Sequence, residues 1–194
     1  RENKVLLERE LWILIMKVQA RSGFPIPVAA IKAYEDARTR VHLDSIDKRE
    51  AILKHDVKAR IEEFNSLAGY ELIHLGLTSR DVTDNVEIYQ IKQSLEIIRF
   101  KALALLSRLA EMSEKYAELA IVGRTHNVPA QITTLGKRFS TWGEELLFSF
   151  SHLEEFINRL PLRGIKGAIG TSSDQIELLG RSEEHTSELQ SRQY

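Results

Sequence analysis

The chain contains no cysteine among its 194 residues. This absence excludes disulfides, thiolate metal sites and a cysteine nucleophile. It is compatible with the cytoplasm, where we expect the protein to act. The sequence also lacks a signal peptide and a long uninterrupted apolar span, so we expect no membrane partner.

The chain has no marked excess of either charge. Lys and Arg number 27 against 28 Asp and Glu, which gives a formal net charge of −1. A balance of this kind offers no global field for nucleic acid, and no nucleic-acid partner is expected. With 43% hydrophobic and 28% charged residues, the composition is typical of an ordinary soluble protein that buries a sizeable core.

Glycine and proline are scarce, with ten and four residues respectively. Neither occurs between Leu77 and Val122, and this stretch predicts a helix of roughly 37 residues, about 55 Å long. A rod that is apolar around Phe100–Leu109 needs neighbouring helices on several sides. We therefore predict an all-α fold, with an N-terminal helical domain over residues 1–77 and the first part of a long-helix bundle over residues 78–180.

A second long helix is predicted from Gln131 to about Leu160, and it contains Gly136 and Gly143. Glycine inside a helix costs about 1 kcal/mol relative to alanine. Close backbone packing at both glycines is the expected compensation.

The stretch between these two helices, Ile121–Lys137, is predicted to be a short polar loop. It places Thr125, His126 and Asn127 together, followed by Pro129, where a first helical turn could begin. Loops between rigid elements often carry catalytic groups. The alternative is that these side chains only satisfy backbone groups at two helix ends.

Two further stretches combine polar side chains that could serve a site. Lys54, His55 and Asp56 place an imidazole beside a carboxylate, although such a pair on a charged helix is more often solvated surface. Ile73–Asn85 contains His74 and leads into the long helix through Thr78 and Ser79. The spacing of Thr78 and Asp81 fits a capping box, and the same helix start could bind a carboxylate or phosphate.

A glycine-rich stretch near the end, residues 162–174, leads to Thr171 and Ser172. Hydroxyls after a glycine-rich loop suit an anion, but the stretch lacks the P-loop pattern, and Thr171 with Asp174 could equally form a cap. Neither H-x-x-x-H nor H-E-x-x-H occurs in the chain, so no metal site is expected.

The sequences GRTHNVPAQITTLGKRF, KHDV, HLGLTS and KGAIGT together resemble the adenylosuccinate lyase family of the fumarase/aspartase superfamily. The resemblance covers residues 1–180 and implies a cofactor-free β-elimination. Fumarate would be released from adenylosuccinate, giving AMP, and from the succinylcarboxamide ribotide of purine synthesis. One departure is Asn127–Val128, where many members have Gly–Gln or Leu–Gln after the histidine.

The resemblance also implies a role for each candidate residue. His126 would be the general acid that protonates the departing amine, and His55 would support it. Substrate-binding roles fall to the following residues: Lys54, Asp56, His74, Thr78, Ser79, Thr125, Thr171 and Ser172.

The family's general base is a serine on a Gly-Ser-Ser loop well beyond residue 180, and its active sites are shared among the subunits of a homotetramer. We therefore expect the 194-residue chain alone to be inactive. Two alternatives stay open, an argininosuccinate lyase-like member of the superfamily and a non-catalytic helical scaffold.

Both ends of the chain carry expectations of their own. The chain begins at Arg1 in an apparent helix without an initiator methionine, so we expect a fragment at its start. Residues 181–194, RSEEHTSELQSRQY, resemble translated sequencing-adapter read-through and are predicted to be an artefactual, disordered tail. A natural polar tail or surface helix is the alternative.

Overall fold

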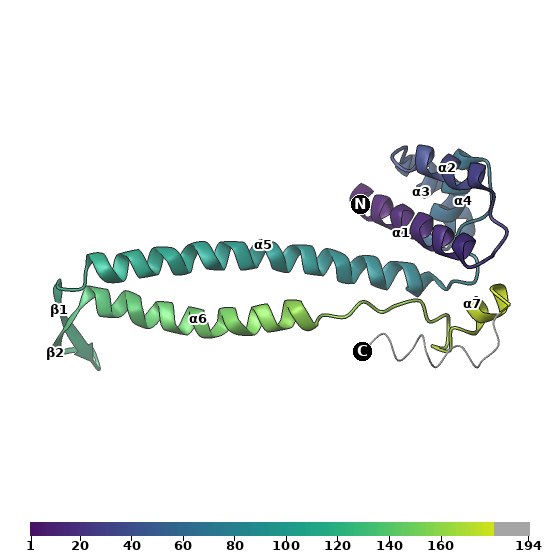
Figure 1. Cartoon of the computed structure of the whole chain (residues 1–194). Coiled ribbons are helices and arrows are strands. Elements are labelled where there is room, and N and C mark those ends of the chain that lie inside the picture. The colour runs from purple at the N-terminus through teal and green to yellow at the C-terminus, as the bar shows by residue number, and fades with distance from the viewer. Residues whose placement is uncertain (181–194) are drawn as a thin grey trace. The chain divides into compact units, whose positions relative to one another are not determined.

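The computed structural model describes residues 1–180, so the predicted tail at 181–194 lies outside the described residues. Contacts group the described chain into a first unit, Arg1–Ile88 with residues 162–180, and a second unit, Tyr89–Pro161. The predicted domain boundary between residues 77 and 78 stays a prediction. In chain order (Figure 1) the elements are α1 (Glu2–Arg21), α2 (Val28–Ala37), α3 (Leu43–Leu53), α4 (Asp56–Ala68), α5 (Ser79–Lys115), β1 (Ala120–Thr125), β2 (Val128–Thr134), α6 (Leu135–Arg159) and α7 (Ser173–Leu178).

The first unit is built around an aromatic core contributed by α1, α2 and α4. Trp12, Tyr34 and Phe64 are completely or almost completely buried, and the rings of Tyr34 and Phe64 meet edge to face at 4.9 Å. The Tyr34 hydroxyl also accepts a hydrogen bond from the backbone N–H of Leu72 at 3.1 Å. The core therefore holds the segment that leads to His74.

Charged side chains are buried beside this core. Arg9 is fully buried, pairs with Glu63 and donates to the carbonyls of Ala37 at 3.0 Å and Arg38 at 2.9 Å. These partners satisfy a charge that would otherwise be costly to bury. The network fixes α1 against α4 and the end of α2.

The residues at several helix ends favour those boundaries, and the predicted entry into the long helix through Thr78 and Ser79 is confirmed. Pro27 immediately precedes α2, Gly69 ends α4 with a left-handed φ of +75°, and α5 begins at Ser79 and runs for 37 residues. Proline before a first turn and a left-handed glycine after a last turn are the usual signals for these boundaries. No helix within residues 1–180 is both long enough and apolar enough to cross a bilayer.

The second unit is an antiparallel pair of helices closed by a β-hairpin. In this unit α5 and α6 run side by side (Figure 1), with Arg99 3.5 Å from Glu154 and the ring of Tyr116 6.1 Å from that of Phe139. Gly136 lets the helices approach, because an added Cβ there would lie 2.4 Å from the carbonyl oxygen of Ser113. The expectation of close backbone packing is wrong for Gly143, where the nearest atom would be 3.7 Å away.

The predicted loop between the long helices is a two-stranded antiparallel sheet, and the prediction that a helix could begin at Pro129 is wrong. Thr125 pairs with Val128 and Arg124 with Pro129, and a bulge adjoins Gly123. Helix α6 therefore begins at Leu135, where the Oγ1 atom of Thr134 accepts the N–H of Lys137 at 3.1 Å. The β-branched residues on both sides of the turn favour strands.

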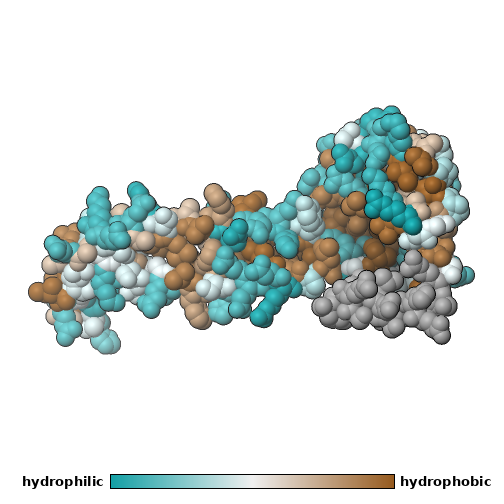
Figure 2. Space-filling view, viewed as in Figure 1, coloured by the Kyte–Doolittle hydropathy of each residue, from teal (hydrophilic) through white to brown (hydrophobic). Residues whose placement is uncertain are grey.

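Many apolar side chains of the second unit are exposed. Phe100, Ile132 and Phe148 keep 75%, 80% and 69% of their surface accessible, and Figure 2 shows hydrophobic side chains among the hydrophilic ones on the visible face. Of the larger side chains on α6, Phe150 and Ile157 are buried, whereas Trp142 and Phe156 are about half exposed.

Candidate active site

His74 lies in the connection between α4 and α5, with a left-handed φ of +64°. Its Nδ1 atom accepts a hydrogen bond from the indole Nε1–H of the buried Trp12 at 3.0 Å. Burial lowers the pKa of His74 to about 4, because it opposes the charged form more than the carboxylate of Asp81 favours it, and the charge of His55 lowers it further. His74 is therefore neutral at pH 7, and His55 lies within electrostatic range of it.

The hydroxyls of Thr78 and Ser79 stand at the start of α5. The predicted capping box is only half formed, because the carboxylate of Asp81 accepts the backbone N–H of Thr78 at 3.0 Å. Neither hydroxyl has a hydrogen-bond partner within residues 1–180. Both can therefore contact a ligand, since a carboxylate does the capping.

Asp81 also holds the glycine-rich stretch against this helix start. Its completely buried carboxylate pairs with Arg163 and accepts the N–H groups of Lys166 at 3.0 Å and Gly167 at 3.1 Å. One turn later, Asn85 exchanges two hydrogen bonds with the backbone of Gly164, each of 3.0 Å. Two acceptor-rich side chains on one helix thus fix a loop that lies about 80 positions away in the sequence.

Thr171 and Ser172 lie at the end of that loop. The Ser172 hydroxyl donates to the carbonyl of Ile165 at 3.0 Å, and its backbone N–H donates to the carbonyl of Lys166 at 2.8 Å. The hydroxyls of Thr171 and Ser173 are 2.6 Å apart. Both predicted residues are thus partly committed to the loop's own structure.

Gln175 connects the two stretches directly. Its Nε2 atom donates to the carbonyls of Leu75 at 2.9 Å and Gly76 at 2.6 Å. A side chain at Gly76 would meet this amide, because an added Cβ would lie 2.7 Å from Nε2. The structure therefore brings the segments of His74, Thr78 and Ser79 together with those of Thr171 and Ser172.

Lys54, His55 and Asp56 occupy a sharp junction between α3 and α4, and of the three only Asp56 lies within a helix. Lys54 ends α3 with a φ of +53°, and His55 is the N-cap of α4. The Nδ1 atom of His55 accepts the N–H of Lys58 at 3.2 Å and lies 3.8 Å from Asp56. The helix start, and not the neighbouring carboxylate, orients this imidazole.

The guanidinium of Arg60 donates a hydrogen bond to the carboxylate of Asp56 at 3.0 Å. Burial alone would raise the pKa of Asp56, but the backbone N–H of Val57 and the Arg60 guanidinium outweigh it and lower the pKa. Asp56 therefore stays ionised at neutral pH. A charged carboxylate held in this way is less suited to an anionic substrate than Lys54 or His74.

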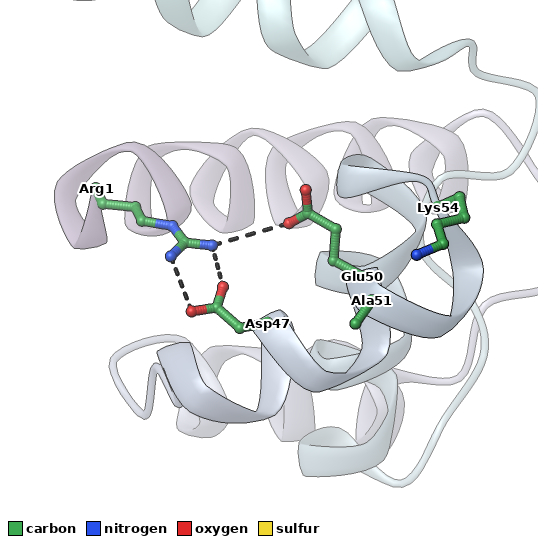
Figure 3. Close-up of a pocket in the computed structure, with 5 residues that line it drawn as sticks. All are labelled: Arg1, Asp47, Glu50, Ala51 and Lys54. Atoms are coloured by element: carbon green, nitrogen blue, oxygen red, sulfur yellow. Dashed lines mark hydrogen bonds and ion pairs between the residues drawn. The ribbon is translucent and has the colours of Figure 1, made fainter.

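Lys54 borders a shallow surface hollow shared with Arg1, Asp47, Glu50 and Ala51. Figure 3 shows the guanidinium of Arg1 bridging Asp47 and Glu50. The hollow thus contains an ion cluster that satisfies its own charges, and nothing in it selects a ligand.

Thr125 and His126 belong to the second unit, in the hairpin of β1 and β2. His126 and Asn127 are the two central residues of the hairpin turn, with φ values of +48° and +62°. Positive φ at both positions is the type I′ geometry, which favours asparagine, aspartate and glycine. The turn therefore exposes His126 at the end of the hairpin, and neither side chain has a hydrogen-bond partner within residues 1–180.

Five residues organise these segments without having been predicted to do so: Trp12, Asp81 beyond its capping role, Asn85, Arg163 and Gln175. Asp81 and Asn85 could have been predicted to act together, because polar residues four apart at the start of an apolar helix share one face. Trp12, Arg163 and Gln175 contact residues far away in the sequence, and no local pattern predicts their roles. Within the described part of the chain, no three His, Asp or Glu side chains are placed to hold a metal ion.

Comparison with known proteins gives a consistent result. A family model described as "Lyase" matches residues 5–175. Adenylosuccinate lyases of Saccharomyces cerevisiae and Caenorhabditis briggsae are each 35% identical to this chain, over 98% and 96% of its length. The chain spans about 40% of the length of these relatives.

The fold is also found in solved structures. A fumarate lyase from Mesorhizobium sp. BNC1 matches with a TM-score of 0.81 at 23% identity, over 93% of this chain and 42% of its own. This likeness concerns the fold and confirms the predicted helical class, to which the structure adds the hairpin of β1 and β2. The chain belongs to the lyase family, and its predicted resemblance to the adenylosuccinate lyases of the fumarase/aspartase superfamily is confirmed.

Proposed function

We propose that this chain is part of an adenylosuccinate lyase that releases fumarate from adenylosuccinate and from the succinylcarboxamide ribotide of purine synthesis. The observation that carries the proposal is the joining of two polar segments, His74–Ser79 and the glycine-rich loop, through Asp81 and Gln175. The identity with adenylosuccinate lyases along nearly the whole chain supports this choice of substrate. The reaction needs no cofactor, and the cytoplasm is the compartment in which we expect it.

The reaction removes a proton and an amine from neighbouring carbons. A base takes the proton from the carbon beside a carboxylate, and the electron pair forms the carbon–carbon double bond of fumarate as the carbon–nitrogen bond breaks. Negative charge builds up on the carboxylate, and hydroxyl donors stabilise it. Thr78 and Ser79 are suited to this task because their hydroxyls are not used for capping.

The leaving nitrogen needs a proton, which we assign to His126 with His55 in support. Lys54, His74, Thr125, Thr171 and Ser172 would bind the remaining parts of the substrate. Asp56 would support substrate binding indirectly, because its ion pair with Arg60 holds the start of α4. The base would be a serine beyond residue 180, and a homotetramer would bring the segments of several subunits into one site.

Expression of the complete reading frame tests this proposal. Fumarate release from adenylosuccinate, with no release from argininosuccinate, is the expected result, and light scattering should give a tetramer. The 194-residue chain alone should release none. Cleavage of argininosuccinate would favour the alternative lyase, and a folded full-length protein that cleaves neither compound would favour a helical scaffold.

A further inference from the structure

The hydrogen bond between Trp12 and His74 determines which ring nitrogen of His74 carries its proton. An indole N–H is a donor only and cannot accept. The Nδ1 atom that receives it at 3.0 Å must therefore be unprotonated, and a neutral ring then carries its proton on Nε2. A flipped ring would place a C–H group against the indole N–H, so the hydrogen bond also selects the ring orientation.

The surroundings keep this pair in place. Trp12 retains only 1% of its surface accessible, and the two rings meet edge to face with centroids 6.0 Å apart and an interplanar angle of 83°. The left-handed φ of +64° at His74 is a conformation that a side chain rarely adopts without such support. Trp12 therefore stabilises both the ring and the backbone that carries it.

The other nitrogen of His74 is available to a ligand. Nε2 has no hydrogen-bond partner within residues 1–180. The buried side-chain atoms without a partner in this range belong to Glu8, Arg9 and Arg60, so Nε2 of His74 is not one of the buried atoms. It therefore keeps access to solvent. The lowered pKa of His74, about 4, agrees with a ring that has a single proton to offer at pH 7.

We propose that Trp12 is a positioning residue that fixes His74 as the tautomer protonated on Nε2, so that His74 binds an anionic oxygen of the substrate as a hydrogen-bond donor. The identity of that substrate rests on the proposed function. In this form His74 does not accept a proton during the reaction, since its only unprotonated nitrogen is occupied by the indole.

The tautomer can be measured in the 194-residue chain by nitrogen-15 spectroscopy of the histidine rings. The His74→Gln variant identifies the signals of His74. We expect Nε2 to be protonated and Nδ1 unprotonated from pH 6 to 8, with a scalar coupling across the hydrogen bond between Nε1 of Trp12 and Nδ1. A ring protonated on Nδ1, or the absence of this coupling, would overturn the proposal.

The Trp12→Phe variant removes the donor and keeps an aromatic ring. We expect a mixture of both tautomers at His74 in this variant. Trp142→Phe makes the same chemical change at a half-exposed tryptophan in the second unit and should leave His74 unchanged. A pure Nε2-protonated signal in a folded Trp12→Phe protein would show that Trp12 does not set the tautomer. Should Trp12→Phe fail to fold, the parent spectrum still decides the tautomer.

Kinetics of the full-length protein test the contact with substrate. Trp12→Phe should raise KM for adenylosuccinate about five-fold, the effect of one misdirected hydrogen bond, with kcat changed less than about two-fold. An unchanged KM in a variant that has lost the tautomer would refute the contact with substrate. A full-length parent that does not cleave adenylosuccinate would instead refute the proposed function and leave the measured tautomer standing.

Discussion

Asp81 and Arg163 form an ion pair although they are 82 positions apart in the sequence. The carboxylate is completely buried in the first turn of α5, whereas the arginine side chain keeps 22% of its surface exposed. Because the same carboxylate accepts backbone N–H groups of Lys166 and Gly167, the pair fixes the glycine-rich loop to the helix that carries Thr78 and Ser79.

Replacing Asp81 with asparagine should therefore destabilise the first unit and release the loop. The substitution removes the buried charge that holds Arg163 and two backbone N–H groups, and it leaves Arg163 with Asp84 at 3.5 Å as its remaining ion-pair partner. We expect a loss of about 3 kcal/mol in the free energy of unfolding. Denaturant unfolding measures this loss. Trypsin should also cleave faster after Arg163 and Lys166.

Asp84→Asn is the matched control, because it makes the same change three residues later on α5. Asp84 is partly exposed and lies 3.0 Å from Arg80 and 3.5 Å from Arg163. Its loss should cost less than about 1 kcal/mol. Equal effects of the two substitutions would show that burial of Asp81 does not matter.

The two glycines of α6 should respond to alanine in opposite directions. Gly136→Ala places a Cβ against the backbone of Ser113 and Ala117, and the overpacking should cost about 1–3 kcal/mol. Gly143→Ala meets only ordinary contact with Leu109 and should stabilise the helix by about 0.5–1 kcal/mol. Denaturant midpoints of both variants check the prediction, and a stabilising Gly136→Ala would contradict the close approach.

The helices could be predicted from the sequence because their signals are local. Pro27, Gly69 and the residues before Ser79 mark helix ends through their own backbone preferences. The hairpin was missed because His126–Asn127 is an uncommon pair for the two central residues of a type I′ turn. Exposure of Trp142 could not be predicted from the sequence either, since periodicity identifies an apolar face without showing whether another helix covers it.

The candidate site could be predicted only as separate segments. Motifs located His74, Thr78 and Ser79, but the side chains that hold them, Trp12 and Gln175, lie 62 and about 100 positions away in the sequence. Spacing along one helix carries no information on such pairs. Physical contact between distant residues is a property of the fold, and one sequence contains no measure of it.

The stability of the first unit should depend on pH through His74. Its folded pKa of about 4 lies below the ordinary value of 6.5. Between pH 4 and 6.5 the unfolded chain therefore binds more protons at His74 than the folded chain does. The contribution of His74 is therefore fully present above pH 6.5 and is lost as the pH falls toward 4, at about 1.4 kcal/mol per pH unit. Denaturant unfolding at several pH values measures it, and in a Trp142→Phe background the remaining fluorescence reports on Trp12.

The His74→Gln variant isolates this dependence. Burial raises the pKa of Glu8, so Glu8 makes the stability depend on pH in the opposite direction. Its contribution to stability is lost as the pH rises through its folded pKa. The difference between parent and variant removes Glu8 from the comparison. A difference that stays constant from pH 7 to 4.5 would show that His74 has an ordinary pKa in the folded chain.

Replacement of His126 should change catalytic activity far more than it changes stability. In the full-length protein His126→Gln keeps a side chain with a positive φ in the turn and removes an imidazole that can act as a general acid. Turnover should fall by about 10²–10⁴, with a smaller change in KM and little change in stability. Steady-state fumarate release and denaturant unfolding of parent and variant measure the two effects.

A second substitution at the same position separates the two roles. His126→Gly removes the side chain and places glycine at a φ of +48°, which glycine adopts without strain, so the hairpin should become more stable by about 1 kcal/mol. Its turnover should be as low as that of His126→Gln. A more stable protein with full activity would mean that the histidine adds strain to the turn without serving the reaction, and the general acid would have to be sought at His55, the N-cap of α4.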